Sequence, residues 1–172
     1  MTRRPRTAIG TAAVCGALLL GGAACGSSSP SGPTAGQAGA DLRTDFTAAL
    51  KAFAHAGSEK PPYTVSSDAS RDVPCGKGKA RRVFTAEQQE NGKGWTDPAS
   101  MHTEIQTAAA YFGRKPGIYM PDLDAKNDEG PTKVSYAMLS TTHHARAVIS
   151  ATATADRLNL IFNGTSDCLP TS

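Results

Sequence analysis

The chain has 172 residues, of which 18 are Lys or Arg and 15 are Asp or Glu, giving a formal net charge of +3. The surplus belongs to Arg3, Arg4 and Arg6, and without them the chain has 15 basic and 15 acidic residues. This balance argues against nucleic acid as a partner, and against a globally cationic protein that collects polyanions.

The first 24 residues have the layout of a bacterial lipoprotein export signal. The apolar stretch from Ile9 to Leu20 follows the arginines, and small residues lead to Cys25. This stretch has about 12 residues, whereas a membrane-spanning helix needs roughly 20. We therefore expect cleavage after Ala24, acylation of Cys25 and a lipid-anchored location on the outer face of the cell membrane. The alternative is an ordinary secretory signal that leaves Cys25 unmodified.

Residues 25–40 comprise the acylated cysteine and a segment rich in Ser, Gly, Pro and Ala, which predicts a disordered tether. Residues 41–172 are expected to form a single domain. A first helix is predicted from Asp41 to Gly57, and a second from Pro98 to Phe112, where Asp97 precedes the helix as N-cap. Each carries an apolar stripe at helical spacing; the first consists of Leu42, Phe46, Ala49, Leu50 and Phe53.

The remaining apolar segments favour strands. They cover residues 82–88, 117–120, 133–139, 147–154 and 158–163, with a tight hairpin connection at 155–157. The order is helix, strand, helix and then four strands, and strands joined by short turns pair antiparallel. We therefore predict the α+β class, with an antiparallel sheet of about four to five strands covered on one face by two helices.

Two cysteines, Cys75 and Cys168, remain after the signal and Cys25 are set aside. A pair of this kind in an exported chain is usually a disulfide. It would close a loop of about 93 residues and stabilise the domain by roughly 4–5 kcal/mol in the chain-entropy description. Metal binding or a redox pair is the alternative, but the two cysteines lack a CxxC spacing.

Several segments together carry a resemblance to a known family. They are Cys25 with its polar tether, Pro74-Cys75-Gly76, the helix start Trp95-Thr96-Asp97-Pro98, and Leu158-Asn159-Leu160 leading to Gly164-Thr165-Ser166-Asp167-Cys168-Leu169-Pro170. In this layout, from Cys75 to Pro170, the chain resembles the small actinobacterial lipoproteins of the LppA type. The resemblance implies a cell-surface lipoprotein and supports the anchor and the disulfide. It implies no catalytic residue.

The strongest charge cluster consists of Lys77, Lys79, Arg81 and Arg82, spaced by Gly76 and Gly78. It could bind phosphate headgroups or an anionic wall polymer, since glycines let backbone N–H groups approach an anion. The spacing is not that of a P-loop. The alternative is a solvated edge or loop.

Other titratable groups favour structural roles. The acids Asp122, Asp124, Asp128 and Glu129 lack the spacing of a calcium loop, which predicts a solvated connection. His143 and His144 are adjacent and could share a metal only on a turn. We predict no metal site and no cofactor. Trp95 either packs on the core or belongs to a binding surface.

These observations favour a non-enzymatic binding or envelope-associated domain. Its expected partners are membrane lipid through the acyl anchor, and a wall polymer, an amphipathic ligand or an envelope protein. An envelope hydrolase with two facing acids of shifted pKa is the first alternative. A structural or assembly factor, which would expose a large apolar patch, is the second.

Overall fold

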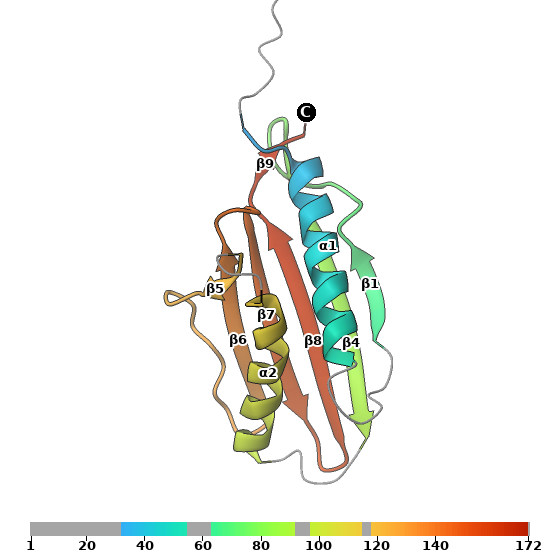
Figure 1. Ribbon diagram of the computed structural model, residues 1–172, viewed down its shortest axis with the longest axis vertical. Helices are drawn as coiled ribbons and strands as arrows, with labels where there is room; N and C mark the ends of the chain where they lie inside the picture. Colours follow the sequence, from blue (N-terminus) through green and yellow to red (C-terminus); the bar gives the residue numbers. More distant parts are fainter. Residues whose placement is uncertain (1–31, 55–62, 92–96, 115–117, 172) are drawn as a thin grey trace, which may run out of the picture.

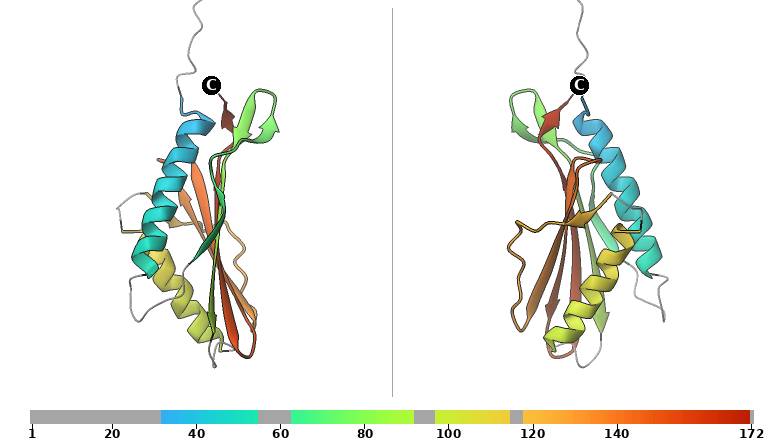
Figure 2. Two further views of the ribbon diagram at one scale, coloured as in Figure 1. Left: turned by 90° about the vertical axis from the view of Figure 1, so that its right-hand side faces the viewer. Right: turned by 60° about the vertical axis from the view of Figure 1, so that its left-hand side comes forward.

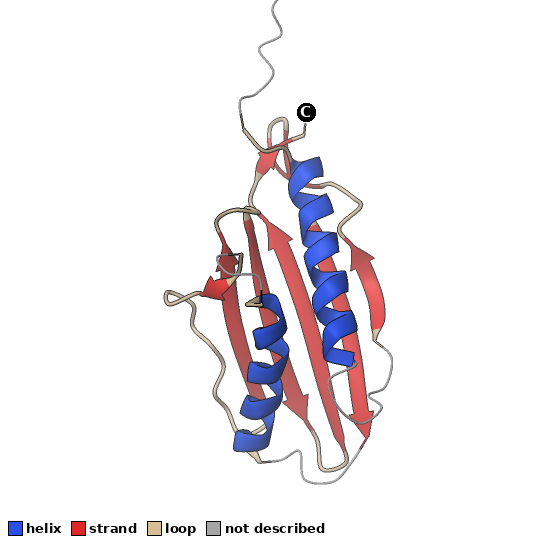
Figure 3. Cartoon of the chain, in the orientation of Figure 1, coloured by secondary structure: helices blue, strands red, loops and turns tan. Residues whose placement is uncertain are grey.

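The computed structural model describes residues 32–54, 63–91, 97–114 and 118–171. Two helices lie side by side on one face of a six-stranded antiparallel sheet, and a small three-stranded sheet extends from one end (Figures 1 and 3). Figure 2 shows that both helices lie on the same side of the large sheet. The predicted α+β class, with two helices on one face of an antiparallel sheet and one disulfide, is confirmed. The sheet is larger than predicted.

The long strands are the ones that the alternation predicted. In spatial order the large sheet contains β1 (Thr64–Asp68), β4 (Val83–Asn91), β8 (Arg157–Ser166), β7 (Ala145–Ala153), β6 (Lys133–Ser140) and β5 (Met120–Pro121). β4, β6, β7 and β8 match the predicted segments, and the predicted hairpin joins β7 to β8. Only Met120 of the predicted strand at 117–120 belongs to β5, and Gly117 lies outside the described residues.

The prediction missed four short strands. They are β1 and the three strands of the small sheet, β2 (Val73–Gly76), β3 (Lys79–Arg81) and β9 (Leu169–Pro170). They have five, four, three and two residues, and most of those residues are exposed or half-buried. A strand with no buried face carries no apolar alternation, so the sequence pattern had nothing to detect.

Helix α1 (Ala35–Ala54) begins six residues before the predicted start. The tether prediction is therefore wrong for residues 35–40, which form its first turns. A capping box explains the early start: the N–H of Gln37 donates to Oγ1 of Thr34 at 3.3 Å, and the N–H of Thr34 donates to Oε1 of Gln37 at 2.9 Å. The apolar stripe that was predicted for this helix is buried in full.

Two glycines allow α1 to approach the sheet closely. A Cβ at Gly164 of β8 would lie 2.6 Å from the ring of Phe46, so this ring rests directly on the strand backbone. A Cβ at Gly39 would lie 2.8 Å from the carbonyl oxygen of Ala69. Both contacts are closer than a side chain allows, and they fix the height of α1 above the sheet.

Helix α2 (Pro98–Phe112) has the predicted bounds. Asp97 caps it by accepting a hydrogen bond from the N–H of Ala99 at 3.2 Å, and Pro98 occupies the first turn. The aromatic ring of Phe112 packs against Phe46, with 4.7 Å between their centroids, and so joins the two helices at the centre of the core.

The disulfide Cys75–Cys168 forms with an S–S distance of 2.07 Å, as predicted. It links β2 to the residue that precedes β9, and thereby fastens the small sheet to the end of β8. The signal segment, Cys25 and Trp95 lie outside the described residues, so the predictions made for them stay predictions. No helix in the described part of the chain is long and apolar enough to cross a membrane.

Candidate ligand-binding cleft between the two helices

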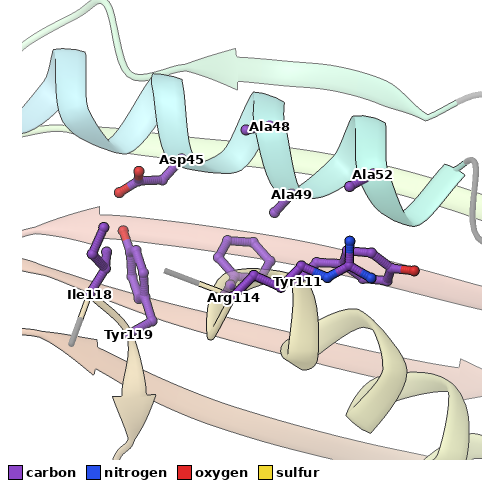
Figure 4. Close-up of a pocket in the computed structure, with 9 residues that line it drawn as sticks. Asp45, Ala48, Ala49, Ala52, Tyr111, Arg114, Ile118 and Tyr119 are labelled. Atoms are coloured by element: carbon purple, nitrogen blue, oxygen red, sulfur yellow. The ribbon is translucent and has the colours of Figure 1, made fainter. Parts of the chain in front are cut away.

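A cleft of about 210 Å³ lies between α1 and the end of α2 (Figure 4). Ala48, Ala49 and Ala52 form its α1 wall, and Tyr111 and Phe112 face them from α2. Positions 48 and 52 are one helical turn apart, so their small side chains lie one above the other on the same face. Because alanine side chains are too small to fill the space between the two helices, a cleft remains there, and its α1 wall is apolar.

The polar end of the cleft is formed by Asp45 and Tyr119. The carboxylate of Asp45 has only 10% of its side-chain surface exposed, and its Oδ2 lies 2.6 Å from Nδ1 of His143. His143 reaches it from the turn between β6 and β7, and is itself 20% exposed. The spacing from Leu42 to Asp45 to Ala49 places this acid on the border of the buried stripe, a signal that the sequence contained and the prediction did not use.

Tyr119 projects into the same end of the cleft. The residue is 5% exposed, and its hydroxyl has no hydrogen-bond partner among the described residues. Figure 4 shows this oxygen directed towards Asp45. Asp45 acts on this hydroxyl through its charge and as a nearby acceptor, although the two groups do not meet standard hydrogen-bond geometry. Unpartnered buried hydroxyls are rare in folded proteins, and each calls for an explanation.

Burial raises the pKa of Tyr119 above its ordinary value of 10.0, and the negative charges of Asp45 and Asp41 raise it further. The phenol is therefore neutral at physiological pH. Its O–H remains a hydrogen-bond donor at the Asp45 end of the cleft. The arrangement can donate one hydrogen bond to an acceptor oxygen that enters the cleft.

The opposite end of the cleft is cationic. The guanidinium of Arg114 lies over the ring of Tyr111, with 3.9 Å between its central carbon and the ring centroid. Arg114 is exposed, so its charge faces both solvent and the mouth of the cleft. The cleft therefore has a neutral donor beside an acid at one end, an apolar middle and a cation at the other end (Figure 4).

The predicted basic cluster lies elsewhere, on the small sheet. Lys79 and Arg81 are exposed on β3 on either side of buried Ala80, and Lys77 is exposed in the turn that precedes β3. Arg82 is separate from them. Its Nε lies 2.8 Å from Oδ1 of Asp72, an ion pair by distance although the N–H direction is not that of a hydrogen bond, and its side chain is 16% exposed.

The guanidinium of Arg82 also donates to the carbonyl oxygen of Ser70. Lys77, Lys79 and Arg81 therefore remain as exposed cations of the predicted set, and the anion-binding role stays a prediction.

Three further residues of the sequence prediction, His143, His144 and Asp122, each face a different partner. Nδ1 of His144 lies 3.4 Å from Asp167 while His143 pairs with Asp45, so the two adjacent histidines face different carboxylates. Asp122 is buried and its Oδ2 lies 3.0 Å from Arg146, so this acid is not solvated as expected. Within the described ranges, no three His, Cys, Asp or Glu residues are grouped to hold a metal ion.

No protein-family model matches this chain, and no curated protein matches its sequence.

Proposed function

We propose that the chain is a lipid-anchored protein on the outer face of the cell membrane, similar to the LppA-type lipoproteins, whose domain binds a small amphipathic molecule between α1 and α2. The signal-like segment before Cys25 supports the anchor. One observation supports the binding function above all: an apolar cleft contains the buried hydroxyl of Tyr119, which forms no hydrogen bond of standard geometry with a described residue. A ligand oxygen would supply the missing hydrogen bond.

The size of the cleft limits the ligand. A water molecule occupies roughly 30 Å³ in the liquid. A cleft of about 210 Å³ therefore holds about seven groups of that size. This volume suits a short alkyl chain or one aromatic ring, and is smaller than the roughly 300–1,000 Å³ of a pocket for a drug-sized molecule. The ligand class is therefore a molecule with one short apolar segment, or the end of a longer chain.

The two polar ends define the rest of the ligand. The neutral donor of Tyr119 matches a hydroxyl, ester or amide oxygen, and the negative charge of Asp45 disfavours an anion there. Arg114 at the other end matches a carboxylate or phosphate. A ligand with a neutral oxygen at one end and an anionic group at the other satisfies both.

The two rival functions have less support. Hydrolysis by paired acids needs two facing carboxylates, whereas Asp45 is the one carboxylate in the described lining of the cleft, and it is bonded to His143. An assembly factor would expose one large apolar patch. The exposed large apolar side chains of the described residues are spread over β1, β2 and the region around β5 and β6; they are Val65, Val73, Met120, Leu123 and Leu139.

Calorimetric titration with octanoate and 8-hydroxyoctanoate tests the binding site, using the chain with Cys25→Ser so that no acyl group competes. We expect both probes to bind, and the hydroxyl to improve binding by about 2- to 10-fold, the value of one hydrogen bond. Tyr119→Phe should remove this difference while leaving the fold intact, because the hydroxyl that it deletes forms no hydrogen bond of standard geometry with a described residue. Arg114→Gln should weaken both probes.

Ala52→Leu fills the middle of the cleft and should abolish the binding of both probes. Ala40→Leu is the matched control, since it places the same side chain on an exposed position of α1 outside the cleft lining. Absence of binding by either probe, or equal binding by the Ala52→Leu and Ala40→Leu chains, would overturn the proposed site.

A further inference from the structure

The end of the domain at which α1 begins is strongly basic. Four exposed side chains supply the charge, and we call them the basic end: Arg71, Lys77, Lys79 and Arg81. None forms an ion pair with a described residue. The nearby acids are engaged, since Asp72 pairs with Arg82 and Asp68 lies 3.9 Å from Arg43. Asp167 lines a hollow together with Arg81, and its Oδ2 lies 3.4 Å from Nδ1 of His144.

The small sheet holds these charges in place. β2 and β3 form a hairpin in which Gly76 pairs with Lys79, so Lys77 and Gly78 form the tip of the turn. Gly78 has a φ of +66°, a conformation that a side chain would strain. β3 also pairs with β9, and the disulfide joins β2 to Cys168. Both lysines are therefore presented by a braced hairpin and not by a free loop.

The described chain begins at the same end as this hairpin, as Figures 1 and 2 both show. Gly32, the first described residue, follows Cys25 by only seven positions in the sequence. Seven residues span at most about 25 Å when fully extended. An acyl anchor on Cys25 therefore keeps this end of the domain, and not the opposite end, next to the membrane surface.

We infer that the basic end contacts the anionic lipid headgroups of the membrane in which the protein is anchored, and orients the domain with the hairpin towards the bilayer. This inference rests on the proposed anchor at Cys25. Each Lys or Arg near an anionic surface improves binding by about fivefold, so four such residues give an appreciable attraction beside the acyl group. The attraction falls steeply with salt because it acts over about one Debye length.

Co-sedimentation with lipid vesicles tests the contact without the anchor. The chain with Cys25→Ser is mixed with vesicles of equal parts phosphatidylcholine and phosphatidylglycerol, or of phosphatidylcholine alone, at low and at high salt. We expect binding to the anionic vesicles at low salt only. Reversing both hairpin charges, Lys77→Glu with Lys79→Glu, should weaken this binding by at least about 20-fold.

The matched control reverses two charges away from the basic end, Lys51→Glu with Arg157→Glu. Lys51 is in the last turn of α1 and Arg157 begins β8 at the opposite end of the sheet, and the change in net charge is the same. Unchanged binding of this control supports the inference. It is overturned if the control loses as much binding as the hairpin variant, if no chain binds anionic vesicles, or if a soluble teichoic polymer binds the basic end and vesicles do not.

The anchor is tested separately by cell fractionation, in which Cys25→Ser should release the protein from the membranes. Retention of that variant in the membrane fraction together with binding to neutral vesicles would contradict the anchor. The vesicle comparison uses the chain without the acyl anchor, so it tests lipid binding by the basic end independently of the fractionation result.

Discussion

Replacing Gly39 with alanine tests whether the first turns of α1 pack on the sheet. Alanine is more favourable than glycine within a helix by about 1 kcal/mol. A Cβ at position 39, however, would lie 2.8 Å from the carbonyl oxygen of Ala69 and 2.6 Å from Cγ of Arg82. Arg82 cannot withdraw freely because it is paired with Asp72. Overpacking of this kind costs about 1–3 kcal/mol, so we expect a net destabilisation of up to about 2 kcal/mol.

Gly36 provides the matched control on the same helix. A Cβ there would have Oγ1 of Thr34 as its nearest neighbour, at 3.8 Å, which is an ordinary contact. Gly36→Ala should therefore stabilise the chain by about 0.5–1 kcal/mol. Urea unfolding followed by circular dichroism measures both variants, and the two midpoints should move in opposite directions. If both substitutions stabilise the chain equally, residues 35–40 are helical but do not pack against the sheet; if neither substitution changes the midpoint, the tether extends to Ala40.

Two further predictions concern the disulfide and the buried phenol. Replacing Cys75 and Cys168 together with serine should lower the free energy of unfolding by about 2–5 kcal/mol, because the bond closes a separation of 93 residues in the unfolded chain; equal urea midpoints for the two chains would contradict this. The pKa of Tyr119 is raised above 10.0 in the folded state, so its contribution to stability is complete below pH 10 and declines as the pH rises above that value. The slope should be up to about 1.4 kcal/mol per pH unit. Stability curves between neutral and strongly alkaline pH should be flatter for Tyr119→Phe, and identical slopes would show that this phenol ionises normally.

The sequence contains signals for the helix that forms one wall of the cleft, but none for the cleft itself. Asp45 lies on the border of the predicted apolar stripe, and the pair Thr34 and Gln37 marks the true start of α1. Both are local signals within one helix. The meeting of Asp45, Tyr119 and His143 is different, since these residues come from a helix, a segment before β5 and a turn after β6. Their separation along the chain carries no periodicity that would connect them.

The sequence by itself determined the two helices, the four long strands and the disulfide. Helical and strand periodicities reflect which side chains face the core, and Cys75 and Cys168 were the two cysteines left to pair. Only the tertiary structure decided the short strands, whose pairing depends on partners distant in the chain. It also decided the cleft, because the space between Ala52 and Tyr111 exists only once α1 and α2 have been placed on one sheet. Patterns along a chain record burial, whereas cavities and charge clusters arise from the distances between elements.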